Sequence, residues 1–179
     1  MTTTYHFSII ALCLAILSSI TSLAYAGDTL DDIRAARNPS TPEHILRQLA
    51  VSENSEIRQN VARNRRAPAD LLMQLAHDPL PEIRITVITN TATSEQTHLY
   101  LTDDPMQQVR SVLARFEYCS SAVMDKLAND KSVDIRIEVA QNWNTSLSTL
   151  QRMTKDSYTE VSHVAARELT KRKLESQQN

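Results

Sequence analysis

The chain has 179 residues, which is enough for one domain with a sizeable core. Its formal net charge of −2 gives no argument for nucleic acid or an anionic membrane surface as its partner. One glycine and two cysteines exclude a glycine-rich phosphate loop and a cysteine-built zinc or iron–sulfur site. We therefore expect stability to come from packing.

The first 26 residues contain no Asp, Glu, Lys or Arg, and the stretch 7–24 is mostly apolar. The sequence Ala-Tyr-Ala then precedes Gly27, which is the small-x-small pattern of a cleavage site. These features predict a signal peptide over 1–26, cleaved between Ala26 and Gly27. The mature protein is then expected to be periplasmic or secreted, with no membrane attachment. Because no Lys or Arg precedes the apolar stretch, an uncleaved membrane anchor stays open as the alternative.

Beyond this segment, apolar residues recur every 26 positions. An alanine-type column holds Ala36, Ala62, Ile88, Ala114, Ala140 and Ala166, and a leucine-type column holds Leu49, Leu75, Leu101, Leu127 and Met153. A fixed period of this size is typical of stacked units, each too small to bury its own apolar face. We expect an N-terminal partial repeat at 27–38, five repeats over 39–168 and a polar C-terminal tail at 169–179.

Each repeat contains two short stretches with helical periodicity. In the second repeat, Leu71, Leu72 and Leu75 share one face of the first stretch, and Ile83 and Val87 share one face of the second. Helices of two to three turns are marginal alone, so neighbouring units must stabilise them. The pattern predicts an all-α solenoid of about five two-helix repeats.

An asparagine column follows the second helix of most units. It holds Asn38, Asn64, Asn90 and Asn142. Because glycine is nearly absent, we interpret these residues as helix C-caps in the left-handed conformation that asparagine tolerates, rather than as ligand-binding groups.

A charged pair is also periodic. Aspartates occur at Asp78, Asp104, Asp130 and Asp156, and Arg84, Arg110 and Arg136 follow the first three of them six residues later. We expect each Asp to bond the Arg of the next helix and to satisfy the turn backbone, rather than to form a basic ladder for anionic ligands. This pairing is expected to fail at both ends, where serines stand at positions 52 and 162.

Taken together, these columns resemble the leucine-rich repeat variant family over roughly residues 31–168. The best copy is I-R-Q-N-V-A-R-N at 57–64, followed by Pro68, Leu72 and Leu75. The Asp-to-Arg spacing is also similar to that of HEAT repeats. The resemblance implies an all-helical right-handed superhelix in which one helix of each pair is partly 3₁₀. It implies no particular activity, because members of the family share none.

Three residues depart from the family pattern. His98 stands where a core leucine is expected, Phe116 replaces the column asparagine and Ser162 replaces the arginine.

The sequence offers little for catalysis. It contains no H-E-x-x-H, G-x-S-x-G, Walker or dinucleotide-binding motif. The histidines of the repeat region fall in different columns, so none forms a metal-binding pair on one helix. Cys119 has no histidine nearby in the sequence, which makes a nucleophilic role improbable. We therefore predict no enzyme activity, no cofactor and no metal.

The second helices carry the most suggestive surface, because inner helices of solenoids line the usual binding face. Alternating arginine and isoleucine on this face suits protein recognition, and aromatic residues cluster near the loops that follow. The candidate partner-binding residues are Arg63, Ile85, Arg115, Phe116, Tyr118, Ile137, Gln141 and Trp143. A solvated helix face, and aromatic cover over a weakened core, remain the alternative interpretations.

The leading hypothesis is an exported, non-catalytic repeat protein that binds another protein, as an envelope scaffold or as an inhibitor of a toxin or hydrolase. Two alternatives stay open. One is an enzyme or cofactor carrier on a helical-repeat scaffold, and the other is a structural spacer held to the membrane by an uncleaved N-terminus.

Overall fold

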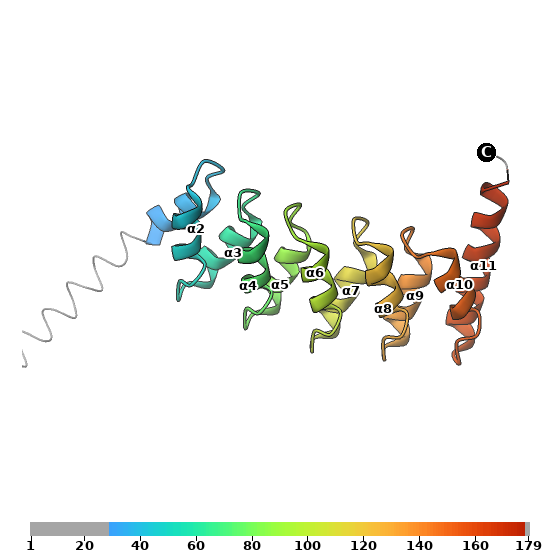
Figure 1. Ribbon diagram of the computed structural model, residues 1–179. Helices are drawn as coiled ribbons and strands as arrows, with labels where there is room; N and C mark the ends of the chain where they lie inside the picture. Colours follow the sequence, from blue (N-terminus) through green and yellow to red (C-terminus); the bar gives the residue numbers. More distant parts are fainter. Residues whose placement is uncertain (1–28, 178–179) are drawn as a thin grey trace, which may run out of the picture.

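The computed structural model describes residues 29–177, and all regular structure in this range is helical. Residues 29–37 form a lead-in helix, and five helix pairs then stack along one axis (Figure 1). The pairs are α2 (Glu43–Leu49) with α3 (Ser55–Arg63), α4 (Ala69–Leu75) with α5 (Pro81–Ile88), α6 (Glu95–Leu101) with α7 (Gln107–Arg115), α8 (Ser121–Leu127) with α9 (Val133–Gln141), and α10 (Leu147–Met153) with α11 (Thr159–Glu175). The predicted α-solenoid is confirmed. The 3₁₀ geometry implied by the resemblance is not found between residues 29 and 177.

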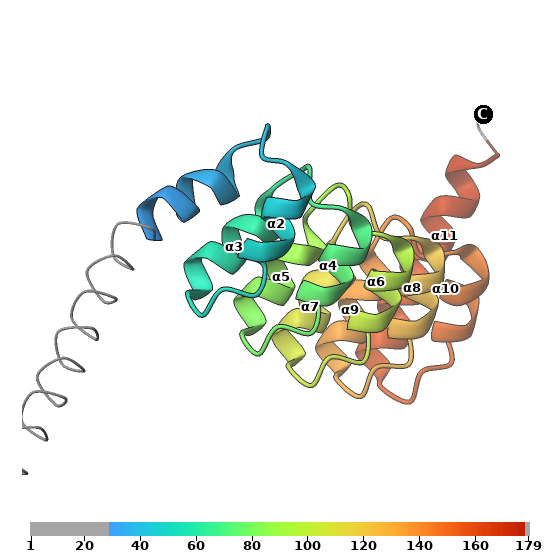
Figure 2. The same ribbon diagram turned by 60° about the vertical axis from the view of Figure 1, so that its left-hand side comes forward.

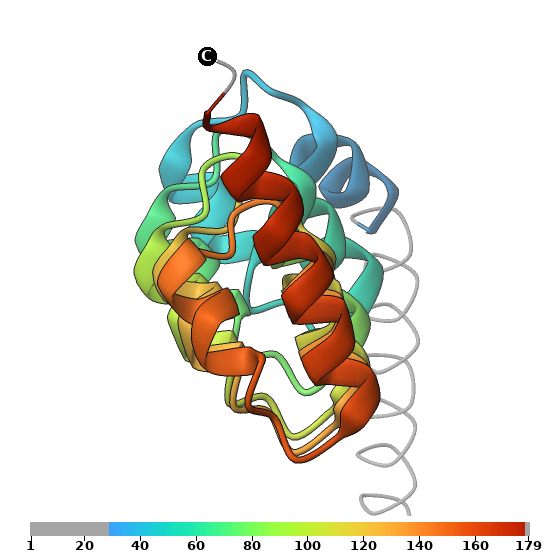
Figure 3. The same ribbon diagram turned by 90° about the vertical axis from the view of Figure 1, so that its right-hand side faces the viewer.

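The helices form two rows. The first helices of the pairs lie in one row and the second helices in the other (Figures 2 and 3). Neighbouring second helices pack on one another more closely than neighbouring first helices do. Closer spacing along one row bends a stack toward that row, so the second helices lie on its inner side.

The periodic apolar columns fill the space between the rows. Ala36, Ala62, Ile88 and Ala114 are completely buried. Ala166 is the exception and is exposed, because no further unit packs against α11.

The C-terminal segment differs from the expected polar tail. Helix α11 continues to Glu175, and Leu169 is buried. Glu168 stands at the column position where the other second helices end, and α11 runs past it for about two more turns.

The column asparagines join consecutive units. The Asn64 side-chain amide donates to the carbonyls of Ala36, at 2.8 Å, and Asn38, at 3.0 Å. Its own oxygen accepts the backbone N–H of Arg66 at 2.9 Å. Asn90 repeats the pattern with the carbonyl of Ala62. Each asparagine thus caps the second helix of the preceding unit.

The predicted left-handed conformation is wrong. Asn64 has φ −70° and ψ 121°, and no residue between 29 and 177 has positive φ. The position requires an amide that donates and accepts at once, not a tolerance of left-handed backbone.

Two departures from the repeat compensate for each other. An asparagine at position 116 would reach the carbonyl of Ile88, but Phe116 has no donor there. Instead, His98 Nε2 lies 3.0 Å from that oxygen. Because a carbonyl only accepts, His98 Nε2 carries the proton and donates it. The Phe116 ring packs edge-on against His98, with ring centroids 5.8 Å apart.

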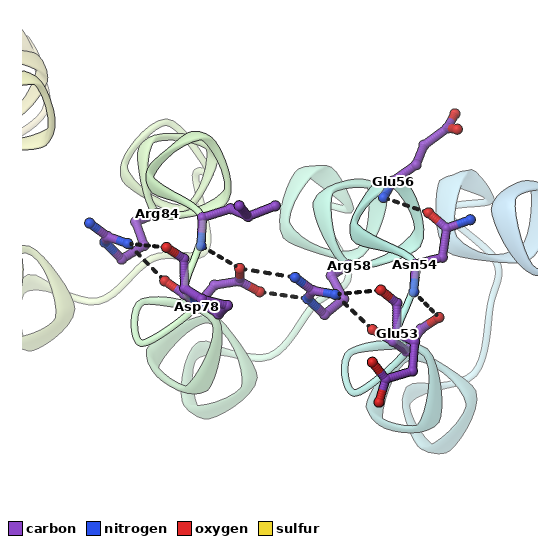
Figure 4. Close-up of polar contacts among 9 residues, drawn as sticks. Glu53, Asn54, Glu56, Arg58, Asp78 and Arg84 are labelled. Carbon is purple, nitrogen blue, oxygen red and sulfur yellow. Dashed lines mark hydrogen bonds and ion pairs between the residues drawn. The ribbon is translucent and has the colours of Figure 1, made fainter.

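Arginines and aspartates form a second set of links between units. Arg58 Nε donates to Asp78 Oδ2 at 2.7 Å, and Arg58 Nη1 donates to the Ser52 carbonyl at 2.8 Å (Figure 4). Asp78 also accepts the backbone N–H of Leu80. The same ion pair recurs in Arg84–Asp104 at 2.6 Å, Arg110–Asp130 at 2.6 Å and Arg136–Asp156 at 2.7 Å.

This pairing corrects the sequence prediction. Each carboxylate bonds the arginine of the preceding unit, whereas the arginine six residues later uses the backbone carbonyl of the aspartate, as Arg84 does with Asp78 at 2.8 Å. In this register every arginine and aspartate of the two columns is paired, so the predicted failure at both ends is wrong. The serines at positions 52 and 162 mark the first and last units.

We expect Arg110→Ala to lower the free energy of unfolding by about 3 kcal/mol or more, because Asp130 is then left buried without its partner. The side chains of Arg110 and Asp130 are only 4% and 5% exposed. Arg63→Ala is the control and should change stability by less than about 0.5 kcal/mol, since Arg63 is exposed. Urea unfolding measures both. Equal losses would refute the structural role assigned to this pair.

A second prediction concerns the histidine substitution. His98→Leu should lower stability by about 1–3 kcal/mol, because the Ile88 carbonyl loses its donor. Adding Phe116→Asn should recover most of that loss by supplying the amide found in other units. Urea unfolding of the two single variants and the double variant measures the coupling between positions 98 and 116. If the changes in unfolding free energy of the single variants simply add in the double variant, the two residues do not compensate for each other.

The same variants differ in their response to pH. Burial lowers the pKa of His98 below its ordinary value of 6.5. The folded state then binds this proton less readily than the unfolded chain. The neutral His98 side chain therefore contributes fully to stability above pH 6.5. This contribution is lost as the pH falls toward the lower pKa that His98 has in the folded protein. Relative to wild type, the double variant should lose less stability between about pH 7 and 5.

Candidate functional site

An open cleft of about 700 Å³ lies between the C-terminal ends of α7 and α9. It brings together four of the predicted binding residues, namely Arg115, Tyr118, Gln141 and Trp143. Two further lining residues, Glu117 and Glu138, were not singled out from the sequence. Glu117 could have been found from the column spacing, which places it one repeat before Trp143.

Two aromatic side chains flank this cleft and face solvent. Tyr118 is 82% exposed and Trp143 is 71% exposed. Phe116 is half-buried and packs edge-on against Tyr118, with ring centroids 5.6 Å apart. Phe116 therefore supports Tyr118 and covers the core below it, as the alternative interpretation of this residue held.

Trp143 is held from the side of α11. The Arg172 guanidinium lies 5.6 Å from the indole centroid, which is within the range of a cation–π contact. Arg172 also donates to the carbonyls of Asn142, at 2.7 Å, and Thr145, at 2.6 Å. The base of the Trp143 loop is thus fixed while the indole remains exposed.

The polar groups of the cleft have both signs. Glu138 accepts hydrogen bonds from Ser111 Oγ at 2.8 and 3.0 Å, and Arg115 Nε lies 3.6 Å from Glu138 Oε1. The Arg115 side chain is 63% exposed, so this ion pair is weak and leaves the guanidinium accessible. No histidine, cysteine or serine is among the residues that line the cleft.

The remaining candidates lie apart from the cleft. Arg63 is exposed at the end of α3, two units away. Ile85 and Ile137 are only partly exposed and pack against the core. They fill space between second helices, so they contribute less to the surface than the alternating pattern predicted.

The described residues were also compared with the requirements of a metal site and of a membrane span. Between residues 29 and 177, no group of three or more His, Cys, Asp or Glu could hold a metal ion. Over the same range, none of the helices has the length and apolar character needed to cross a membrane. The predicted signal peptide at 1–26 lies outside the described residues and stays a prediction.

Comparisons with known proteins agree with the repeat assignment. The family model for the leucine rich repeat variant matches residues 56–80, which confirms the resemblance seen in the sequence. A solved structure described as a leucine-rich repeat variant with a novel repetitive structural motif is similar, with a TM-score of 0.58 and 22% identity over 73% of this chain. The match covers 52% of that chain, so this protein spans about half its length. At this identity the likeness shows the fold alone. No curated protein matches.

Cys119, next to Tyr118 in the sequence, provides a test of how well the core beside the cleft is closed. It is 2% exposed, and burial raises the pKa of its thiol to about 12. We therefore expect Cys119 to stay protonated at pH 8 and to react with a thiol reagent only when the protein unfolds. The measurement uses a Cys13→Ser variant, which leaves one thiol. Fast reaction of the folded protein would show that Cys119 is accessible.

Proposed function

From this stack of leucine-rich repeat variant units, we propose an exported, non-catalytic scaffold that binds another protein through the Tyr118–Trp143 cleft and the adjoining ends of the second helices. The observation that carries the proposal is the pair of exposed aromatic side chains across one open cleft. Large aromatic residues are enriched among those that dominate binding energy at protein interfaces.

The repeat itself does not require these aromatics. The loop position of Trp143 is occupied by Pro39, Arg65 and Glu117 in other units, which fold in the same way. Because this position accepts proline or arginine in other units, packing of the repeat does not require a tryptophan there. A binding role accounts for its exposure and for the contact with Arg172 that holds its loop.

The cellular role is proposed from the sequence. The predicted signal peptide supports export, and a scaffold in the cell envelope or an inhibitor of a toxin or hydrolase are both compatible with a binding cleft. The mass of the protein isolated from its native source tests the cleavage between Ala26 and Gly27. An uncleaved chain would favour the membrane-held spacer instead.

We expect Trp143→Ala and Arg115→Glu each to weaken partner capture while the fold survives. Truncation of an aromatic hot spot typically costs about 2 kcal/mol or more of binding free energy. Gln74→Glu, on the exposed face of α4, is the control and should bind as wild type does. Crosslinked capture from the native cell extract measures the effect, and circular dichroism checks the fold.

The purified partner then gives a direct measurement. Trp143 is the only tryptophan of the chain, so its emission reports occupation of the cleft. If both variants stay folded and still capture every partner that wild type captures, the cleft is not the binding site.

A further inference from the structure

A cluster of arginines lies on the same edge of the molecule as the cleft. Arg63 ends α3, and Arg65 and Arg66 lie in the loop that leads to α4. All three are exposed, and their side chains have no hydrogen-bond or ion-pair partner among residues 29–177. Exposed arginines elsewhere are paired, as Arg47 is with Asp70 at 2.8 Å.

The repeat places this cluster in line with the cleft. The loops between units form a row along the upper edge in Figure 1, and positions 65, 117 and 143 are equivalent in that row. Neighbouring packed helices lie about 8–10 Å apart, so three units separate Arg65 from Trp143 by about 25–30 Å. An extended peptide spans that distance with about eight or nine residues. The loop next to the arginines carries the small side chains of Thr91 and Ala92, and the loop after it carries Glu117 and Tyr118.

We propose that this row of loops binds one extended acidic segment of the partner protein. The carboxylates of the segment contact Arg63, Arg65 and Arg66, and its far end reaches the Tyr118–Trp143 cleft. Guanidinium groups suit this role because they bind carboxylates with two parallel hydrogen bonds. The inference rests on the proposed protein-binding function and names the chemistry of the partner.

The charge distribution favours a peptide over a nucleic acid or a membrane. The cleft end of the row carries Glu117 and Glu138, which would repel a continuous run of phosphates. A peptide can place acidic residues at the arginines and other residue types at the cleft.

The test uses the whole protein and a fluorescein-labelled hexaglutamate peptide, followed by fluorescence anisotropy at low salt. The peptide should bind, and Arg63→Gln with Arg65→Gln and Arg66→Gln should weaken binding by about fivefold or more, since three exposed ion pairs are lost together. The matched control combines Lys131→Gln, Lys155→Gln and Lys171→Gln, which removes the same charge from exposed positions elsewhere. It should change affinity by less than about twofold.

Three outcomes would overturn the proposal. Equal weakening by both triple variants would mean that only net charge matters. Failure of hexaglutamate to bind would exclude an acidic segment. Arginine-dependent binding of a single-stranded oligonucleotide or of phosphatidylglycerol vesicles, with no binding of hexaglutamate, would indicate a nucleic acid or a membrane instead.

A separate variant distinguishes this proposal from the proposed function. Six extended residues span about 20 Å, which falls short of Trp143 when the peptide sits on the arginines. Trp143→Ala should therefore leave hexaglutamate binding unchanged, although it weakens capture of the partner. A variant that loses only capture of the partner bears on the proposed function of the cleft. A variant that loses only hexaglutamate binding bears on the proposed role of the arginine cluster.

Discussion

The stack depends on backbone carbonyls that a single unit cannot satisfy. Each second helix ends on such groups, and the next unit supplies the donor, as Asn64 does for Ala36 and Asn90 does for Ala62. On the opposite edge, buried pairs such as Arg84–Asp104 fix the spacing between turns. A buried polar group without a hydrogen-bond partner costs free energy. The helix ends and the turns of one unit therefore have all their hydrogen bonds only when the next unit is packed against them.

Two units in the C-terminal half, where the candidate site also lies, supply this donor from a residue other than asparagine. His98 takes over the donor role at Ile88, which releases position 116 for Phe116 and so for the aromatic group that supports Tyr118. In the last unit Arg172 reaches back to the carbonyl of Asn142 and contacts the Trp143 ring. His98 and Arg172 thus keep the contacts between units and also allow aromatic side chains at positions 116, 118 and 143.

The edge formed by the inter-unit loops is consequently uneven along its length. Its N-terminal part presents arginines without a side-chain partner among residues 29–177, and its C-terminal part presents Tyr118 and Trp143 beside carboxylates. The side chains in these loops are free to vary because the asparagine backbone contacts hold the loop shape. A regular scaffold can therefore present a graded surface without any change in fold.

The sequence by itself determined the period, the helix pairs and the buried columns, because each of these depends on the apolar pattern within one unit. It also singled out Tyr118 and Trp143 as candidate binding residues, since aromatic residues stand out in a chain that contains few. Only the tertiary structure decided which aspartate bonds which arginine. In a strict repeat, the arginine six residues after Asp104 and the arginine twenty residues before it occupy the same column, so spacing alone cannot separate them. The packing of consecutive units places Arg84 against Asp104. Contacts between units also show that the column asparagines cap the second helix of the preceding unit. They show as well that Ile85 packs against the core between neighbouring second helices.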